Sequence, residues 1–352
     1  MNILMVGVSK ETQGGMYTVV SNYLDNKTLK QKASIQYVPT STVGSIPKRL
    51  YFSFQGIIKI LKILMKNNID IIHIHMSERG SVYRKGIVLR IAKFFKVNTI
   101  THMHGADFED WYLSLSKSKR NRVKKIINMS DEIIILGENW RDIFSTVMID
   151  ESKINVIYNA VPTLQNNLYN ENANSLLFLG ALIERKGIYD ILQVAVKLNK
   201  RLPEHITFDF YGPDPNGDFS KKIIELGLEK RVLYHGWLKN EDKNEVFSKA
   251  LLNLLPSYNE GLPMTILETM AYGIPNISTN VAAIPEAIKN NINGRLIEPG
   301  DIMSLEKAIL DIVQDKNCRK MYSQNAFQSI KNTFSIDHHI EELLRIYYKV
   351  MN

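Results

Sequence analysis

The chain has 352 residues, of which 45% are hydrophobic and 23% charged, and it contains one cysteine, Cys318. This length exceeds one comfortable hydrophobic core and predicts two domains. The lone cysteine excludes a disulfide scaffold and a cysteine metal cluster, and it fits a reducing compartment such as the cytoplasm. The first residues, MNILMVGV, are typical of a buried strand and not of a signal peptide, and no apolar run reaches the ~18 residues of a membrane-spanning helix.

The net charge of +8 is unevenly divided along the chain. Residues 1–160 hold 23 Lys and Arg against 13 Asp and Glu, a net of +10, whereas residues 161–352 hold 21 against 23, a net of −2. A positive field attracts anionic partners, which may be nucleic acid, anionic lipid or a phosphorylated acceptor. Because the basic half lacks interleaved aromatic residues and a recognition motif, we expect no nucleic-acid partner.

The first half alternates strand-like apolar runs with helical patterns, as a doubly wound parallel sheet requires. The predicted strands are residues 2–8, 69–75, 97–103 and 131–136. The loop at residues 9–15 follows the first strand and ends in Gly14 and Gly15, where a backbone can approach a ligand closely. It lacks the G-x-G-x-x-G pattern, which argues against a dinucleotide-dependent dehydrogenase.

Residues 53–67, SFQGIIKILKILMKN, follow a helical period. One side is predicted to be apolar, and three lysines align on another side; the apolar residues are Phe54, Ile57, Ile58, Leu61, Leu64 and Met65. Such a helix can lie on an anionic membrane surface, or it can be a core helix with a solvated cationic face. A second basic run, KSKRNRVKK at residues 117–125, favours the membrane alternative modestly.

Four histidines lie on or directly after the second and third of these strands. His73 and His75 share one face of a strand, as do His102 and His104, because side chains alternate along a strand. Ligands of open α/β sheets gather beyond the carboxyl ends of the strands, where His104 falls. The other three are expected to be core or rim residues with satisfied hydrogen bonds, and without a Cys or carboxylate ligand nearby we predict no metal site.

The second half restarts the strand and helix pattern after a polar, Asn-rich stretch at residues 163–174, which we interpret as a linker. A strand at residues 175–180 is followed by Arg185 and Lys186, directly before a helix at residues 188–199. Cations in that position can supply fixed positive charge to a diphosphate, Arg as a fork and Lys as a point charge.

Residues 256–301 are the most informative stretch, PSYNEGLPMTILETMAYGIPNISTNVAAIPEAIKNNINGRLIEPGD. Gly261 allows a tight bend, and Pro263 fits the first position of a helix, where no N–H is needed. The next amides, on Met264 and Thr265, then lack an intrahelical partner. A helix start of this kind is an anion site, and phosphate is its usual occupant.

Two acids flank this predicted anion site. Glu260 precedes the helix and Glu268 lies inside it, so both carboxylates can accept hydrogen bonds from hydroxyl groups. A phosphate site with hydroxyl acceptors on either side is what a sugar nucleotide needs.

The order of these residues, E-x7-E, a helix ending at Gly273, Pro275, a strand, Glu286 and then NGRLIEPGD, resembles the donor-binding signature of family-four retaining glycosyltransferases with the GT-B fold. The resemblance covers the chain from end to end, densely in the second half. It implies two Rossmann-like doubly wound domains that face a cleft. The implied divisions are an acceptor-binding domain at 1–162, the linker at 163–174, a nucleotide-sugar-binding domain at 175–335, and a helix at 336–352 that crosses back to the first domain.

The resemblance also implies roles for individual residues. Those assigned to catalysis are Lys186, Arg185, Glu260 and His104. Those assigned to donor binding are Glu268, Gly261, Leu262, Pro263, Met264, Thr265, Gly236 and Trp237, and those assigned to the acceptor side are Gly14 and Gly15. Trp237 could stack on the nucleotide base or fill a core. The chain departs from the family pattern at Ala181, where relatives carry arginine, and at Ala282-Ala283, where relatives often carry paired glycines.

The predicted function is a retaining hexosyltransferase that uses a nucleoside-diphosphate sugar, with UDP as the favoured carrier, and a free or lipid-linked saccharide acceptor of a bacterial surface polymer. No D-x-D element stands in a suitable place, so we expect no metal ion or other cofactor, with cationic side chains taking the metal's role. The protein would act in the cytoplasm, either free or at the inner face of the membrane. The alternatives are a nucleotide-sugar epimerase on the same fold and a non-catalytic nucleotide-sugar-binding subunit.

Overall fold

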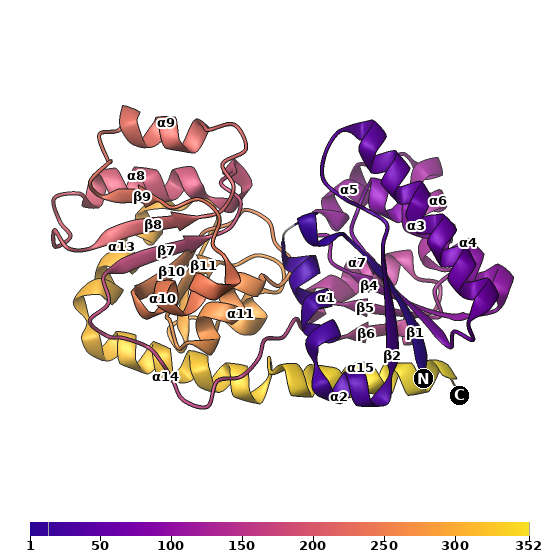
Figure 1. Cartoon of the computed structure of the whole chain (residues 1–352). Coiled ribbons are helices and arrows are strands. Elements are labelled where there is room, and N and C mark those ends of the chain that lie inside the picture. The colour runs from indigo at the N-terminus through magenta and orange to yellow at the C-terminus, as the bar shows by residue number, and fades with distance from the viewer. Residues whose placement is uncertain (13, 352) are drawn as a thin grey trace. The chain divides into compact units, whose positions relative to one another are not determined.

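A computed structural model describes residues 1–12 and 14–351 and divides the chain into two compact units. Unit 1 is Met1–Ala160 together with the C-terminal segment from Ile336, and unit 2 is Val161–Ser335. Gln13, in the predicted loop at residues 9–15, and Asn352, at the end of the predicted last helix, lie outside the described residues. Each unit contains one parallel sheet covered by helices, which is the predicted two-domain Rossmann-like arrangement (Figure 1).

The sheet of unit 1 has six strands in the order β2-β1-β3-β4-β5-β6. Their runs are short and apolar, and all six residues of β3 are buried, as expected for a sheet covered on both faces. The strands are β1 Asn2–Gly7, β2 Ser34–Pro39, β3 Ile71–Met76, β4 Asn98–Met103, β5 Glu132–Ile135 and β6 Ile154–Val156.

Helices cover both faces of this sheet. α3 and α4 pack together on one face, with α6 against α4, whereas α1, α2 and α15 contact strands from the other face. The helices are α1 Gly15–Asp25, α2 Lys27–Lys32, α3 Ile46–Lys66, α4 Gly80–Phe95, α5 Phe108–Ser114, α6 Lys117–Ile127, α7 Arg141–Val147 and α15 Ile336–Met351.

The sheet of unit 2 also has six strands, in the order β12-β11-β10-β7-β8-β9. They are β7 Ser175–Leu179, β8 Thr207–Tyr211, β9 Val232–Tyr234, β10 Ala250–Leu255, β11 Asn276–Thr279 and β12 Gly294–Ile297. α8 packs with α13, and α11 packs with α14 and against β10 and β11. The helices are α8 Ile188–Leu198, α9 Asp218–Glu225, α10 Lys243–Ser248, α11 Met264–Ala271, α12 Ile284–Ala287, α13 Ile302–Gln314 and α14 Lys316–Asn332.

Both sheets have a point where the strand order reverses. In unit 1 the chain runs from β1 to β2 on one side and then to β3 on the other, and in unit 2 it runs from β7 through β8 and β9 and then to β10. Loops at the carboxyl ends of the two strands that flank such a point diverge and leave space for a ligand. Candidate sites are therefore expected after β1 and β3 in unit 1 and after β7 and β10 in unit 2.

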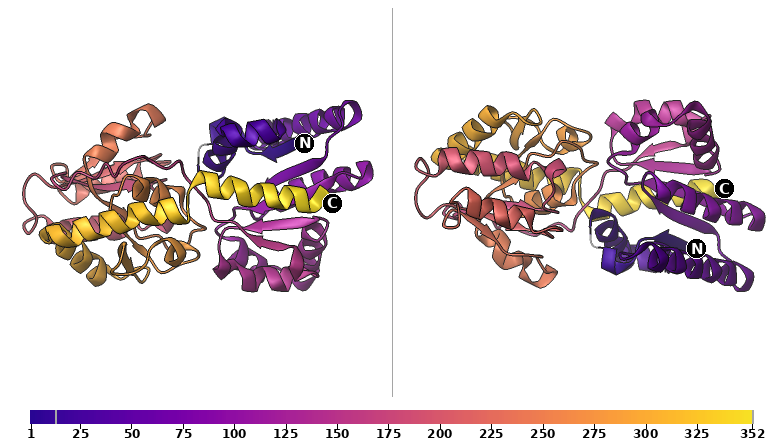
Figure 2. Two further views of the ribbon diagram at one scale, coloured as in Figure 1. Left: turned by 90° about the horizontal axis from the view of Figure 1, so that it is seen from below. Right: turned by 90° about the horizontal axis from the view of Figure 1, so that it is seen from above.

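The last helix, α15, belongs to unit 1 although it follows unit 2 in the chain. It packs against β3, β4 and α2 (Figure 2). Its apolar side, including Ile340, Leu343 and Tyr347, is buried. The predicted C-terminal helix that crosses back to the first domain is thus confirmed. Within the described residues, none of the helices combines the length and hydrophobicity that crossing a bilayer requires.

The apolar side predicted for α3 agrees with the structure only in part: Leu64 is buried and Ile57, Ile58 and Leu61 are half-buried, but the other two residues face solvent. Phe54 and Met65 are 62% and 66% exposed, whereas the buried residues are Gly56, Ile60 and Leu64. A Cβ at Gly56 would lie 2.8 Å from the Pro39 carbonyl oxygen, so this glycine permits close contact between α3 and the end of β2. That contact fixes the rotation of the helix and leaves large apolar side chains facing outward.

The histidines of β3 and β4 are core residues, as predicted, but their hydrogen bonds are not all satisfied. His75 is paired in register with His102, and the rings of His73, His75 and His102 stack at centroid distances of 4.6–5.6 Å. His73 Nε2, His75 Nε2 and both ring nitrogens of His102 are buried without a hydrogen-bond partner among the described residues. One nitrogen from each of the three lies within 4.8 Å of the others, a grouping that the sequence analysis did not anticipate.

Burial keeps these imidazoles neutral. It lowers the pKa of His73 and of His104 to about 3 and that of His339 to about 4, and it lowers the pKa of His75 and His102 as well, with neighbouring histidine charges adding to the effect at the β3 and β4 positions. A buried imidazolium here would face other histidines, which lie on β3, β4 and α15. Proton uptake is therefore easier in the unfolded chain than in folded unit 1.

We predict that acid destabilises unit 1 from about pH 6.5 downward. Because the folded pKa values lie below the unfolded value of ~6.5, stability is complete above that pH and is lost as the pH falls toward 3–4, by ~1.4 kcal/mol per pH unit for each histidine that charges on unfolding. Urea unfolding at pH 7.5, 6.5 and 5.5 measures this slope. His102→Leu removes one of these histidines, so it should reduce the slope by the contribution of about one proton. An unchanged slope would contradict the conclusion that His102 charges on unfolding.

Candidate functional site

The carboxyl ends of β7 and β10 bring together two of the residues assigned to catalysis. Lys186 ends a short 3-10 helix, Glu184–Lys186, after β7, and Glu260 lies in the loop after β10. Their side chains form an ion pair and are 17% and 8% exposed. Ser257 donates a hydrogen bond from Oγ to Glu260 Oε1 at 2.8 Å. The pair lies at the point where the strand order of unit 2 reverses, as a ligand site should.

The backbone around this pair is held by close contact between the two loops. Gly187 has φ 70°, and a Cβ there would lie 2.1 Å from the Pro256 carbonyl oxygen. The Tyr258 N–H donates to the Arg185 carbonyl at 2.8 Å, and Arg185 Nη1 donates to the Asn259 carbonyl at 2.5 Å. Arg185 therefore braces the loop that carries Glu260, and its remaining N–H groups are donors that a diphosphate could use.

Glu268 has a partner that the sequence did not indicate. Lys243, at the start of α10, contacts its Oε1 at 2.9 Å, and the two side chains are 26% and 16% exposed. A lysine has three N–H donors, so Lys243 can hold a carboxylate and still meet a ligand. No local sequence pattern predicts this pair, because Lys243 and Glu268 lie more than 20 residues apart in the chain and meet only through the packing of α10 and α11.

The start of α11 differs from the prediction by one position. Pro263 is the residue before the helix, with φ −67° and ψ 126°, and the helix begins at Met264. The first intrahelical bond runs from the Leu267 N–H to the Pro263 carbonyl at 3.4 Å. The amides of Met264 and Thr265 precede that bond, so the reason for predicting an anion site here is unchanged. Gly261 and Leu262 are buried in the loop that leads to it.

Gly236 and Trp237 follow β9. The Gly212 N–H donates to the Gly236 carbonyl at 2.8 Å, which ties the segment to the loop after β8. Trp237 is 48% exposed, so it does not fill a core. Stacking of Trp237 on a nucleotide base stays a prediction.

The loop after β11 accommodates Ala282-Ala283, where relatives often carry paired glycines. Ala282 has φ 46°, a left-handed conformation that glycine adopts freely and that costs alanine ~1–2 kcal/mol. The next amide, Ala283 N–H, donates to the Gly261 carbonyl at 3.3 Å. The chain thus keeps the backbone that a glycine would have, and the loop supports the turn before α11.

The residues assigned to unit 1 lie at the corresponding edge of its own sheet. His104 follows β4. Its Nε2 shares a hydrogen bond with His75 Nδ1 at 2.9 Å, and its ring stacks on that of His75. Because its pKa is lowered to about 3, chiefly by burial, the ring is neutral at pH 7 and can serve a ligand through a hydrogen bond but not as a cation. Gly14 precedes α1 with φ 148°, and Gly15 is the first residue of that helix.

A pair of glycine substitutions tests the contact between the β7 and β10 loops. Gly227 also has a positive φ, 64°, but a Cβ there would meet nothing within 4 Å. Gly227→Ala should therefore cost only the left-handed strain, whereas Gly187→Ala should cost a further ~1–3 kcal/mol because its Cβ collides with backbone. Urea unfolding of the two variants measures the difference. Equal losses of unfolding free energy in the two variants would show that the loop after β10 can move away from the new Cβ at no cost.

Comparison with known proteins agrees with this geometry. A model of "Glycosyltransferase Family 4" matches residues 13–164, and a model of "Glycosyl transferases group 1" matches residues 163–329. An uncharacterized glycosyltransferase of Methanocaldococcus jannaschii is 30% identical over 273 residues, which are 75% of this chain and 71% of that protein.

Two further proteins show the same similarity. The Escherichia coli protein named UDP-Gal:alpha-D-GlcNAc-diphosphoundecaprenol alpha-1,3-galactosyltransferase is 27% identical over 319 residues, 83% of this chain and 79% of that protein. The crystal structure of HepE from Anabaena in complex with UDP superposes with a TM-score of 0.77 at 15% identity, covering 99% of this chain and 100% of that one. The chain therefore belongs to the family-four glycosyltransferases and has the GT-B fold.

Proposed function

We propose that the protein is a retaining, metal-independent hexosyltransferase that moves a sugar from a nucleoside-diphosphate sugar to a saccharide acceptor in the synthesis of a bacterial surface polymer. The observation that carries the proposal is the buried Lys186–Glu260 pair at the reversal point of unit 2. The E. coli relative carries UDP-Gal in its name and HepE was solved with UDP, which supports UDP as the carrier and a lipid-linked saccharide as the acceptor.

The chemistry needs charge control at the leaving group. The bond between the anomeric carbon and the diphosphate oxygen breaks, and the nucleoside diphosphate leaves with the electron pair. The acceptor hydroxyl oxygen forms the new bond and gives up its proton. Lys186, Arg185 and the amides that begin α11 are fixed positive groups that can stabilise the departing diphosphate, the service that a divalent ion performs elsewhere.

The carboxylates have a different task. Glu260 orients Lys186 and presents oxygens that can accept hydrogen bonds from the transferred sugar, and Glu268 is placed to do the same for the ribose. Trp237 supplies an exposed ring for the base, and His104, with Gly14 and Gly15, would serve the sugar and acceptor from unit 1. Retention of configuration rests on family membership.

We predict that Lys186→Gln lowers the rate of UDP release from UDP-glucose or UDP-galactose by about two to three orders of magnitude. Glutamine still donates to Glu260, which limits the loss of ~3–5 kcal/mol that an unpaired buried carboxylate would cause. Lys197→Gln is the matched control, because Lys197 pairs with Glu306 on the surface of the same unit. A Lys186→Gln rate within a few-fold of the Lys197→Gln rate would reject the assignment.

The same assay separates the alternatives. An epimerase would convert the UDP-sugar into its epimer without releasing UDP, and a binding subunit would take up UDP-sugar with no turnover. In a transferase, nuclear magnetic resonance of the glycoside formed should show the same anomeric configuration as the donor. An inverted product would contradict the retaining mechanism.

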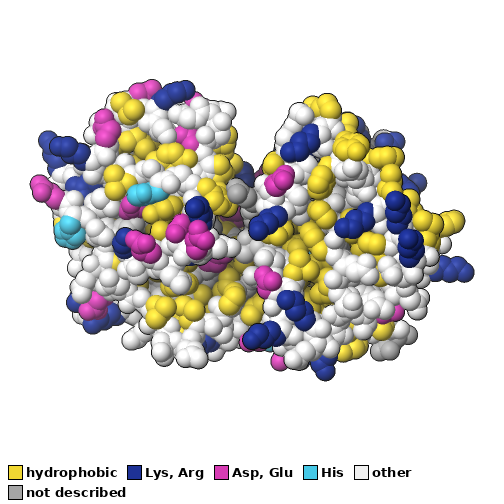
Figure 3. Space-filling model, in the orientation of Figure 1, with side chains coloured by type: hydrophobic (Ala, Val, Ile, Leu, Met, Phe, Trp, Pro, Cys, Tyr) yellow, Lys and Arg dark blue, Asp and Glu magenta, His cyan; other side chains and the backbone are white. Residues whose placement is uncertain are grey.

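The outward side of α3 supports an anionic membrane surface as a further partner. Four large apolar side chains on its first two turns are 62–70% exposed, namely Ile46, Leu50, Tyr51 and Phe54. Lys48 and Arg49 are exposed among them, and Figure 3 shows hydrophobic and basic side chains interspersed over this part of unit 1. An apolar strip among cations is the pattern of a helix that lies in a bilayer interface.

We predict that Leu50→Gln with Phe54→Gln weakens binding to vesicles containing phosphatidylglycerol by at least ~10-fold, since partial burial of two such side chains is worth well over ~1.4 kcal/mol. The control is Ile224→Gln with Met303→Gln, which removes two apolar side chains that are 66% and 77% exposed on unit 2. Co-sedimentation at low salt measures both. Equal binding by the two double variants would argue against the α3 surface.

A further inference from the structure

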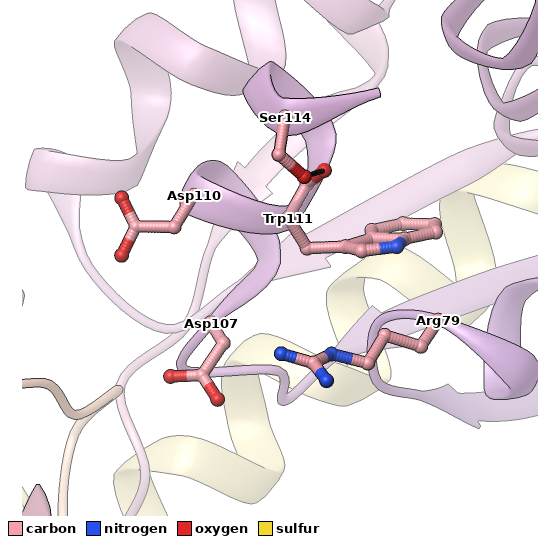
Figure 4. Close-up of a pocket in the computed structure, with 5 residues that line it drawn as sticks. All are labelled: Arg79, Asp107, Asp110, Trp111 and Ser114. Atoms are coloured by element: carbon pink, nitrogen blue, oxygen red, sulfur yellow. Dashed lines mark hydrogen bonds between the residues drawn. The ribbon is translucent and has the colours of Figure 1, made fainter. Parts of the chain in front are cut away.

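A pocket in unit 1 is separate from the residues assigned to the donor. It has a volume of about 470 Å³, within the ~300–1,000 Å³ range of small-molecule sites, and it lies beyond the carboxyl ends of β3 and β4. Its lining combines an aromatic ring, a guanidinium, a hydroxyl and two carboxylates, contributed by Trp111, Arg79, Ser114, Asp107 and Asp110 (Figure 4).

The two loops that form the pocket are locked together beneath it. A Cβ at Gly105 would lie 2.0 Å from Glu78 Oε2 and 2.8 Å from the Glu78 amide nitrogen, so the loop after β4 rests directly on the loop after β3. Arg79 follows Glu78 with φ 56° and ψ −128°, a conformation that is strained for a residue other than glycine. Such strain persists only where the surroundings impose it, and it tends to occur at ligand sites.

The tryptophan is held by its neighbours. Trp111, on α5, meets Phe108 at a centroid distance of 5.9 Å and 62°, and Tyr83 at 6.5 Å and 88°. Ser114 Oγ donates to the Trp111 carbonyl at 2.7 Å. In Figure 4 the Arg79 side chain passes below the indole ring and points toward Asp107. The pocket thus offers an aromatic ring with hydrogen-bonding groups around it.

That combination suits a sugar ring, which has apolar C–H faces and a rim of hydroxyl groups. Carboxylates accept from hydroxyls, and a guanidinium donates to them. Two aspartates and one arginine give the lining a net charge of −1, which disfavours an anionic ligand. One lining residue, Asp107, lies three residues after His104, beyond the carboxyl end of β4.

We infer that this pocket binds a neutral saccharide ring of the acceptor, with Trp111 against an apolar face and Asp107 and Asp110 on its hydroxyls, and that it excludes acidic sugars. The inference rests on the proposed transferase function and names its acceptor class. A carboxylate of the ligand held close to a carboxylate of the lining is repelled by it, so discrimination of at least ~10-fold against a uronic acid is expected.

Saturation-transfer nuclear magnetic resonance on the full chain tests the inference with defined probes. These are the methyl α-glycosides of glucose, galactose and N-acetylglucosamine, with methyl α-glucuronide as the acidic match to the glucoside. At least one neutral glycoside should bind at millimolar concentration, and at least ~10-fold more tightly than the glucuronide. No binding of any neutral glycoside up to 50 mM, or equal binding of glucoside and glucuronide, would overturn it.

Substitutions in the lining test whether the glycoside binds in this pocket. Trp111→Ala should weaken the neutral glycoside at least ~10-fold, and Trp111→Phe should restore part of it, which guards against a folding defect. Asp110→Asn should narrow the preference for glucoside over glucuronide, whereas Glu109→Gln, an exposed neighbour outside the lining, should not. Unchanged binding in Trp111→Ala, or the same effect from Asp110→Asn and Glu109→Gln, would overturn the inference.

UDP binding, followed by thermal stabilisation, separates this inference from the proposed function. If UDP stabilises every Trp111 and Asp110 variant while glycoside binding fails in the wild type, the pocket inference is overturned and the donor site stands. If glycosides bind through Trp111 but UDP does not stabilise the protein, the pocket inference is supported and the donor site is rejected.

Discussion

The site in unit 2 depends on one buried ion pair between two loops that are 74 residues apart in the chain. Lys186 and Glu260 meet because β7 and β10 are neighbours in the sheet, because Gly187 has no side chain to separate their loops, and because Ser257 fixes the carboxylate. A buried pair of this kind contributes little net stability once desolvation is counted. Its value is that it fixes a charge where a diphosphate could arrive, and positive groups held in place before the reaction need no reorganisation during it.

Unit 1 also contains a six-stranded parallel sheet, with a different strand order, and it handles buried polarity differently. Its sheet carries neutral histidines in place of an ion pair, and Lys85, 1% exposed, donates from Nζ to the Gly7 carbonyl at 3.0 Å and to Thr40 Oγ1 at 2.5 Å. Burial lowers the pKa of this lysine as well, with Arg84 adding to the shift. Most charged groups of unit 1 lie on its surface, which gives the unit its basic exterior.

The two units therefore divide the chemical requirements of glycosyl transfer. Unit 2 has cations and helix amides suited to a diphosphate, together with carboxylates suited to hydroxyls. Unit 1 has a neutral histidine, a pocket with an aromatic wall, and an outward strip of apolar and basic side chains on α3. The pocket excludes acidic ligands by its own carboxylates although the unit as a whole is basic, because charge interactions at contact distance outweigh a screened field.

The sequence by itself determined the alternation of strands and helices, the two sheets, the returning C-terminal helix and the family whose donor-binding signature residues 256–301 resemble. These follow from local periodicity and from glycine, proline and glutamate at fixed spacing, which act within a few residues of one another. Only the tertiary structure decided that α3 turns Phe54 outward, that Lys243 pairs with Glu268, that histidines of β3 and β4 keep unpartnered nitrogens, and that Arg79 and Trp111 line one pocket. Each of these depends on a contact between elements distant in the chain, such as Gly56 against Pro39 or Gly105 against Glu78, and helical or strand periodicity carries no information about such contacts.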